Sequence, residues 1–177
     1  MLKTMAALIL GATVALFSPA EAQQGAGNAL TPFAGSMAPM PDPASLSVRG
    51  AVYVPAYSSI RFGSGKTVLD LATTLSIHNV SDSAPLVLER IDYYDTAGSL
   101  VERYLPAPIA IRSFGTVEIF VPKDDTRGGT GANFVISWAA VAAIPEPVIE
   151  TVMIGSMGNN SYSFVSQGRP IRIPSAK

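Results

Sequence analysis

The chain of 177 residues has no cysteine and a single histidine, and only 14% of its residues are charged. Without cysteine the protein has no disulfide framework, thiolate metal site, iron–sulfur cluster, cysteine nucleophile or lipid-modified N-terminal cysteine. One histidine excludes a zinc site built from several histidines of one chain. The formal net charge of −1 provides no basic field for nucleic acid or an anionic membrane surface. The mean hydropathy of +0.33 is high, which directs attention to apolar segments.

The first 22 residues have the three-part pattern of a secretory signal peptide. Lys3 gives a positive start, residues 5–17 are uncharged, and Ala20-Glu21-Ala22 matches the motif at which signal peptidase cleaves. A membrane anchor is the alternative, but the run falls short of the about 20 apolar residues that span a bilayer. We therefore expect cleavage before Gln23, export to the periplasm or the medium, and no transmembrane anchor in the mature chain.

Residues 23–47 are dominated by Gly, Ala, Ser and Pro, and Asp42 is their only charge. Four prolines in this segment prevent a regular hydrogen-bond ladder. The segment contains too little apolar surface to offset the entropy lost on ordering. We expect a flexible leader over 23–47, followed by one folded domain over 48–177.

From residue 48 onward, apolar and polar residues alternate with the period of β-strands. Strands are expected over 86–94, 100–105, 133–141, 147–155 and 162–167, with a hairpin turn at Asp95-Thr96-Ala97-Gly98. The pattern predicts an all-β, immunoglobulin-like sandwich of about seven to eight strands. One further strand has two faces, an apolar face of Leu69, Leu71, Leu75 and Ile77 and a polar face of Asp70, Thr74, Ser76 and His78.

The segment Trp138–Ile144 (WAAVAAI) is the one place where a helix competes with a strand, because alanine tolerates a helix well. Val135 and Ile136 precede it and favour a strand at its start. The aromatic residues recur through the expected strands and are assigned to the core and to cross-strand pairs. They are Tyr53, Tyr57, Tyr93, Tyr94, Tyr104, Phe134 and Trp138.

Several sequence blocks together carry a resemblance to a known family. They are 52–58 (VYVPAYS), 69–79 (LDLATTLSIHN), 91–95 (IDYYD), 98–105 (GSLVERYL), 124–134 (DDTRGGTGANF), Trp138, 153–155 (MIG), 164–166 (FVS) and Gly168-Arg169. In this order and spacing the chain resembles, over about residues 52–171, the bacterial exported family called domain of unknown function 3124. The resemblance implies an envelope or secreted domain without an established activity, and it supplies no catalytic residues. A histidine often follows the 57–58 pair in that family, whereas this chain has Ser59.

A glycine-rich loop is the most distinctive local feature, and it forms our candidate binding surface together with the neighbouring hairpin. A phosphate-binding loop would need a following lysine and a helix, and a dinucleotide fingerprint would need glycine where Phe134 stands. The favoured interpretation is a tight connection with positive φ at several glycines, and the alternative is a backbone-lined ligand site. The candidate residues are Arg127, Gly128, Gly129, Thr130, Gly131, Asn133, Asp92 and Asp95.

Other constellations give weaker signals. The carboxylates of Asp92, Asp95, Asp124 and Asp125 could suit Ca²⁺, but their spacing is not that of an EF-hand and Asp95 suits a turn, so no metal site is expected. His78 would need Ser76 or Ser163 and an acid to form a nucleophilic triad, and no G-x-S-x-G motif presents a serine. Met37 and Met40 are too few sulfur ligands for a Cu(I) site.

The sequence therefore predicts an exported, non-enzymatic protein without a cofactor, with a binding or scaffolding role in the cell envelope. The expected partner is an envelope protein or glycan, held by the glycine-rich loop or by an exposed strand edge. The alternative is a carboxylate-based hydrolase or a metal-binding periplasmic protein that uses His78 and the four aspartates named above.

Overall fold

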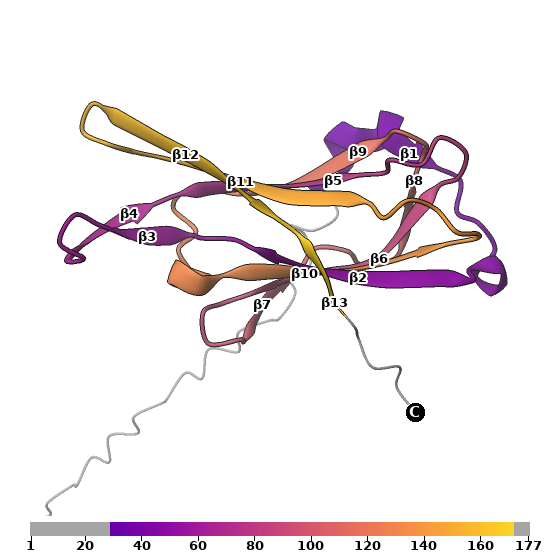
Figure 1. Ribbon diagram of the computed structural model, residues 1–177, viewed down its shortest axis with the longest axis horizontal. Coiled ribbons are helices and arrows are strands. Elements are labelled where there is room, and N and C mark those ends of the chain that lie inside the picture. Colours follow the sequence, from indigo (N-terminus) through magenta and orange to yellow (C-terminus); the bar gives the residue numbers. More distant parts are fainter. Residues whose placement is uncertain (1–28, 172–177) are drawn as a thin grey trace, which may run out of the picture.

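Two antiparallel β-sheets pack face to face in the computed structural model, which describes residues 29–171 (Figure 1). One sheet has the strand order β1-β8-β6-β10-β2-β13, with β7 paired to β6, and the other has the order β12-β11-β5-β9. This arrangement confirms the predicted all-β sandwich. No helix within 29–171 is long and apolar enough to cross a membrane. The strands are β1 (Met37–Ala38), β2 (Val48–Pro55), β3 (Ser59–Phe62), β4 (Thr67–Asp70), β5 (Ala72–His78), β6 (Leu86–Tyr94), β7 (Leu100–Arg103), β8 (Ile109–Ile111), β9 (Thr116–Val121), β10 (Asn133–Ala140), β11 (Val148–Met157), β12 (Asn160–Gln167) and β13 (Arg169–Ile171).

The core lies between the two sheets, and strand β10 lies in the middle of the seven-stranded sheet, between β6 and β2. Phe134, Ile136 and Trp138 point inward from β10, whereas Val135 and Ser137 lie on the outer face of the sheet. β10 pairs with β2 on one side and with β6 on the other, so its backbone groups are satisfied in the sheet. The segment 138–144 therefore begins as a strand, and the helical alternative is wrong.

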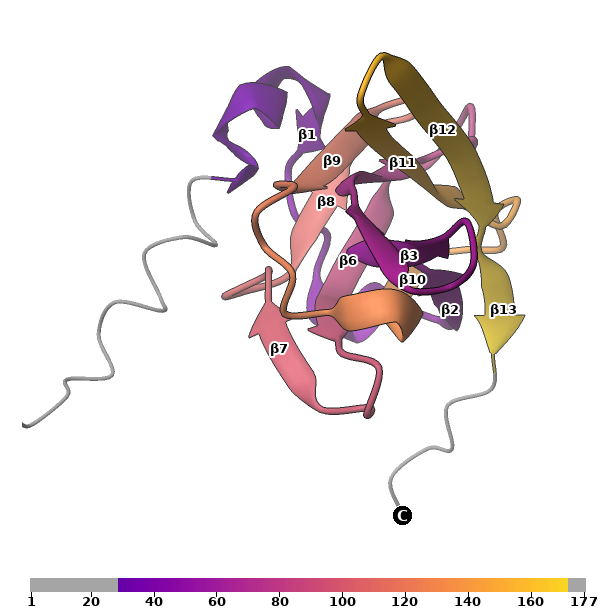
Figure 2. The same ribbon diagram turned by 90° about the vertical axis from the view of Figure 1, so that its left-hand side faces the viewer.

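The last two strands belong to different sheets although the chain between them is almost continuous (Figure 2). β12 pairs with β11, and β13 pairs with β2 after the single residue Gly168. A Cβ atom at Gly168 would lie 2.5 Å from Val52 Cγ1 and 2.8 Å from the carbonyl oxygen of Ile149. Only glycine permits this close approach, so Gly168 allows the chain to pass from one sheet to the other.

The predicted strand through residues 69–77 is two strands in the structure. β4 pairs with β3 as a separate hairpin, and β5 joins the four-stranded sheet, with Leu71 between them. The Leu71 N–H donates to the Ser58 carbonyl instead of to a sheet partner. The predicted faces are nevertheless confirmed in part, since Leu69, Leu71, Leu75 and Ile77 are all buried, although Ser76 on the opposite face is buried too.

Residues 29–47 differ from the flexible leader expected there. The chain forms short 3₁₀ turns, η1 (Thr31–Ser36) and η2 (Pro43–Ser45), and β1 pairs with β8. Leu30 and Phe33 pack against the main core, and Leu46 is buried on the outer face of the seven-stranded sheet. A few well-placed apolar side chains therefore anchor a segment whose average composition is that of a linker. The expected signal peptide over 1–22 and residues 23–28 lie outside the described residues.

Candidate functional site

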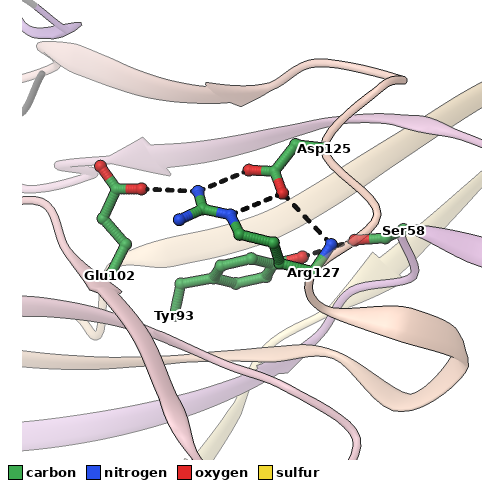
Figure 3. A network of polar contacts seen from close by, with 5 residues as sticks. All are labelled: Ser58, Tyr93, Glu102, Asp125 and Arg127. Carbon is green, nitrogen blue, oxygen red and sulfur yellow. Dashed lines mark hydrogen bonds and ion pairs between the residues drawn. The ribbon is translucent and has the colours of Figure 1, made fainter. Parts of the chain in front are cut away.

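The glycine-rich loop follows β9 and carries an ionic network around Arg127 (Figure 3). The guanidinium donates from Nε to Asp125 Oδ1 over 2.8 Å and from Nη2 to Asp125 Oδ2 over 2.7 Å. Nη2 also donates to Glu102 Oε2 on β7 over 2.9 Å. Arg127 thus joins its own loop to the β6–β7 hairpin, in the two-pronged geometry that arginine and carboxylate favour.

This network shifts the ionisation of its members in the direction that favours the charged pair. Hydrogen bonds from Arg127 lower the pKa of Asp125, and burial opposes that shift to a smaller degree. The hydrogen bond to Asp125 is the main cause of a raised pKa at Arg127. Both groups therefore remain charged at neutral pH, and neither is poised to exchange a proton with a substrate.

Beneath the ionic network, two buried hydroxyls form a second polar contact. Tyr93 Oη and Ser58 Oγ lie 2.6 Å apart, and both residues are almost fully buried. Burial raises the pKa of Tyr93, partly offset by this hydrogen bond. The Tyr93 ring packs against Phe134 with a centroid distance of 4.8 Å. Tyr93 is therefore a core residue with one satisfied polar atom, as expected for a buried tyrosine.

The loop backbone is held by the surrounding structure rather than left free for a ligand. The Gly128 carbonyl accepts from both the N–H and the hydroxyl of Thr96, and the Gly129 carbonyl accepts from the Ser58 N–H. The Gly131 N–H donates to Thr96 Oγ1 over 2.9 Å. These bonds favour the structural interpretation of the loop over a backbone-lined ligand site.

Only one glycine of the loop has the positive φ that the sequence suggested for several. Gly129 has φ of +71°, whereas Gly128 has φ of −70°. At Gly128 the requirement is space, because a Cβ atom there would overlap the Tyr93 hydroxyl. Of the remaining candidates, Thr130 is exposed and Asn133 begins β10 half-buried.

The two hairpin aspartates of the candidate surface have separate roles. Asp92 is fully buried beside Arg90 and Arg103, at 3.4 and 3.1 Å. Asp95 accepts from the backbone N–H groups of Ala97 and Ser99, which confirms its predicted place in the turn. Across residues 29–171, no group of three or more histidine, aspartate or glutamate side chains is arranged to hold a metal ion.

His78 makes two contacts along the four-stranded sheet. Its Nε2 lies 3.0 Å from Ser76 Oγ, and its Nδ1 lies 2.9 Å from Thr116 Oγ1. The structure therefore does bring Ser76 to His78, as a nucleophilic triad would require. The position of the acid is occupied by Thr116, which carries no charge to stabilise an imidazolium. His78 is half-buried between these two hydroxyls, so its environment is polar but without a carboxylate partner among the described residues.

Sequence reasoning did not identify Glu102, Ser58 or the two arginines on Asp92. These residues meet through strand pairing and loop packing: β6 pairs with β7 so that Asp92 lies opposite Arg103 and Tyr93 opposite Glu102. The Asp95–Gly98 turn already implied an antiparallel hairpin, but the register shifts between Tyr93 and Tyr94, and this shift brings Arg103 opposite Asp92. The turn residues alone do not predict that shift.

Comparison with known proteins gives a family and no activity. No curated protein is significantly similar to the chain. The crystal structure of Thermotoga maritima 1070 is similar over 68% of this chain and 92% of its own, with a TM-score of 0.41 and 13% sequence identity. The family described as protein of unknown function (DUF3124) matches residues 49–171. This match confirms the resemblance drawn from the sequence blocks and spans more than half of the chain, which therefore belongs to the DUF3124 family.

Proposed function

We propose that this protein is an exported, non-enzymatic binding module of the bacterial envelope that holds a protein partner on the outer face of its four-stranded sheet. The observation that carries the proposal is a group of apolar side chains left exposed on this face. Val148, Ile154 and Val165 are 48%, 55% and 54% exposed, and Phe120 is 61% exposed. Clustered exposed apolar residues typically mark interaction surfaces.

Strand register places these side chains on one face. Val165, Val152, Thr74 and Phe120 are successive cross-strand partners over β12, β11, β5 and β9. Ile154 and Val148 are an even number of residues from Val152 on β11 and point the same way. The intervening residues Ile149, Thr151 and Met153 are buried in the opposite direction. The apolar residues therefore lie on one side of the sheet, which we call the apolar face.

The charge of the apolar face indicates the kind of partner. The next cross-strand row runs Glu150, Ser76, Glu118, and among residues 29–171 neither glutamate forms an ion pair. A partner that offers an apolar surface with a lysine or arginine would satisfy both features. A second copy of the same face would oppose glutamate to glutamate, so a different protein is the better occupant.

The loop and the acidic groups give less support to the alternatives. The backbone of the glycine-rich loop is occupied by Ser58 and Thr96, and Asp92 and Asp125 are neutralised by arginines. A hydrolase or metal site would need those carboxylates free and close together. The export component rests on the three-part pattern over 1–22.

The test is site-specific photo-cross-linking in the native host. A photo-reactive residue in place of Phe120 or Val165 is expected to give one adduct of defined mass, and the same residue at exposed Leu100 on the other sheet is the control. The adduct formed from position 120 must disappear when Val165→Asp or Glu118→Lys is added, and the adduct formed from position 165 must disappear when Glu118→Lys is added, with the melting temperature unchanged. The proposal would be contradicted by equal labelling from Leu100 or by an adduct that persists in the presence of Glu118→Lys. It would also be contradicted by an adduct between two copies of this protein. N-terminal sequencing of the mature protein tests export, and a start at Met1 would contradict it.

A further inference from the structure

We propose that the outer face of the seven-stranded sheet binds an acidic glycan, through two arginines that a buried carboxylate holds side by side. The three residues are Asp92 and Arg90 on β6 and Arg103 on β7. This site lies on the opposite sheet from the apolar face, so the inference goes beyond the proposed function and does not depend on it.

Asp92 is the fixed centre of the site. Its side chain is 0% exposed although it lies on the outer face of the sheet, because neighbouring side chains cover it. Arg103 Nε donates to Oδ1 over 3.1 Å, Arg90 Nε lies 3.4 Å from Oδ2, and the Tyr94 hydroxyl donates to Oδ2 over 3.3 Å. A carboxylate without solvent contact requires such partners, so both guanidinium groups are held in place.

The two arginines retain unused binding capacity. Each approaches Asp92 most closely through Nε, and within residues 29–171 neither makes another side-chain hydrogen bond or ion pair. Their side chains are 36% and 58% exposed. The terminal nitrogens are the donors that suit a carboxylate, sulfate or phosphate group. Two positive charges on one negative charge leave the cluster with a net charge of +1.

Strand register extends this site into a row across the sheet. Arg103, Asp92, Val135, Tyr53 and Arg169 are successive partners on β7, β6, β10, β2 and β13. At roughly 4.8 Å per strand, the row spans about 19 Å. Tyr53 is 36% exposed, and Arg169 is exposed without an ion pair to any residue of the described range. Cationic groups therefore stand on both sides of an accessible aromatic ring.

An acidic glycan matches this row better than other polyanions. Its sugar rings present apolar C–H surfaces that stack on an aromatic side chain, while its acid groups recur at intervals along an extended chain. A membrane would call for apolar anchors around the cations, whereas the exposed large apolar residues of the row are limited to Tyr53. The net charge of −1 for the whole chain opposes a long nucleic acid.

The experiment measures binding of the signal-cleaved protein to oligogalacturonate, a carboxylated oligosaccharide, with a neutral dextran oligomer of equal length as control. We expect binding to the acidic oligomer alone, with an affinity that falls as salt rises. Arg103→Gln is expected to weaken binding about tenfold or more, since hydrogen bonds between charged groups are among the strongest. Arg169→Gln and Tyr53→Leu test the row at two exposed positions that do not touch Asp92, so these variants keep the test valid if Arg103→Gln unfolds.

Arg112→Gln is the matched control, because Arg112 is an exposed arginine at the end of β8, off this row. Absence of binding to oligogalacturonate would overturn the proposal, as would an equal loss in Arg112→Gln. Tighter binding to phosphatidylglycerol vesicles or to a single-stranded DNA of similar charge would also overturn it, in favour of a membrane or nucleic-acid site. Inorganic phosphate that competes as well as the oligomer would show that the site takes only a free anion. None of these outcomes affects cross-linking from the apolar face.

Discussion

Gly128 lies directly against the hydroxyl of Tyr93, so that a side chain on Gly128 would overlap the phenolic oxygen. The same oxygen is hydrogen-bonded to Ser58, which also donates its backbone N–H to the loop at Gly129. The glycine-rich loop is thus fitted to a tyrosine of the core. This relationship explains a conspicuous glycine pair through packing, and it gives the first prediction.

Gly128→Ala is expected to lower the free energy of unfolding by about 1–3 kcal/mol, because the added methyl group must displace Tyr93 or the loop. Urea denaturation followed by circular dichroism measures the change. Gly35→Ala is the matched control, since nothing lies within 4 Å of a Cβ atom there and its effect should stay within about 0.5 kcal/mol. An equal effect in both variants would refute the packing account.

The hydrogen bond between Tyr93 and Ser58 is expected to show energetic coupling. Tyr93→Phe and Ser58→Ala should each cost about 1–3 kcal/mol, because each leaves the other buried hydroxyl without a partner. The double variant should cost clearly less than the sum of the two, since it removes both hydroxyls together. A double-mutant cycle in urea measures the difference, and strict additivity would contradict the bond.

Stability should depend on the ionisation of Asp125 in acid. Arg127 holds the pKa of Asp125 below its ordinary value of 3.8, so the folded state binds a proton less readily than the unfolded state. The stabilisation is therefore complete well above pH 3.8 and disappears as the pH falls through the lowered pKa. Wild type should exceed Asp125→Asn in stability at pH 7, and the difference should shrink below about pH 4.

Denaturation of both proteins between pH 7 and pH 2 measures this difference, and Asp124→Asn at the exposed neighbouring position is the control. High salt should reduce the difference at pH 7, because Arg127 is half-exposed. A difference that stays constant down to pH 2 would show that the loss in Asp125→Asn is not ionic.

The strands were predictable wherever local pattern and packing agree. The expected strand over 86–94 is β6, and the one over 133–141 is β10 to within one residue. In such segments the alternation of apolar and polar residues and the flanking turn residues predict the strand, whichever strands lie beside it. Residues 29–47 are the opposite case, because Phe33 and Leu46 are isolated apolar residues among prolines. Their burial depends on a surface formed by strands distant in the sequence. The composition of the segment therefore predicted a flexible leader where the structure has an ordered one.

For the candidate site, the sequence predicted which segments matter but not which residues contact one another. The sequence drew attention to the loop around Gly128 and to Asp92, and both are structurally important. Their roles depend on partners that strand register supplies: Arg103 opposite Asp92, and Glu102 within reach of Arg127. Periodicity assigns a residue to a face of its own strand but does not name the residue beside it, and a shift of one position would exchange the faces.

Strand register also shows that the two outer faces differ in charge. The apolar face carries Glu118 and Glu150, and the outer face of the other sheet carries Arg90, Arg103 and Arg169 near the buried Asp92. A partner attracted to one face is therefore repelled by the other. Such a division suits a scaffold that joins two different components, and it separates the tests of the two proposals.

The single tryptophan allows a last prediction to be observed directly. A Cβ atom at Gly50 would lie 2.5 Å from Cε2 and Cζ2 of Trp138, its partner across β2 and β10. Gly50→Ala should therefore displace the indole toward the adjoining cleft of about 330 Å³, which Arg49, Glu146 and Ile171 help to line. We expect a loss of about 1–3 kcal/mol in stability, a red-shifted emission maximum and stronger quenching by acrylamide.

In a Trp138→Phe background the smaller ring leaves room for the methyl group, so Gly50→Ala should cost less there than in the wild type. Unchanged emission and quenching in Gly50→Ala, or an equal cost in both backgrounds, would show that the indole does not require glycine opposite it.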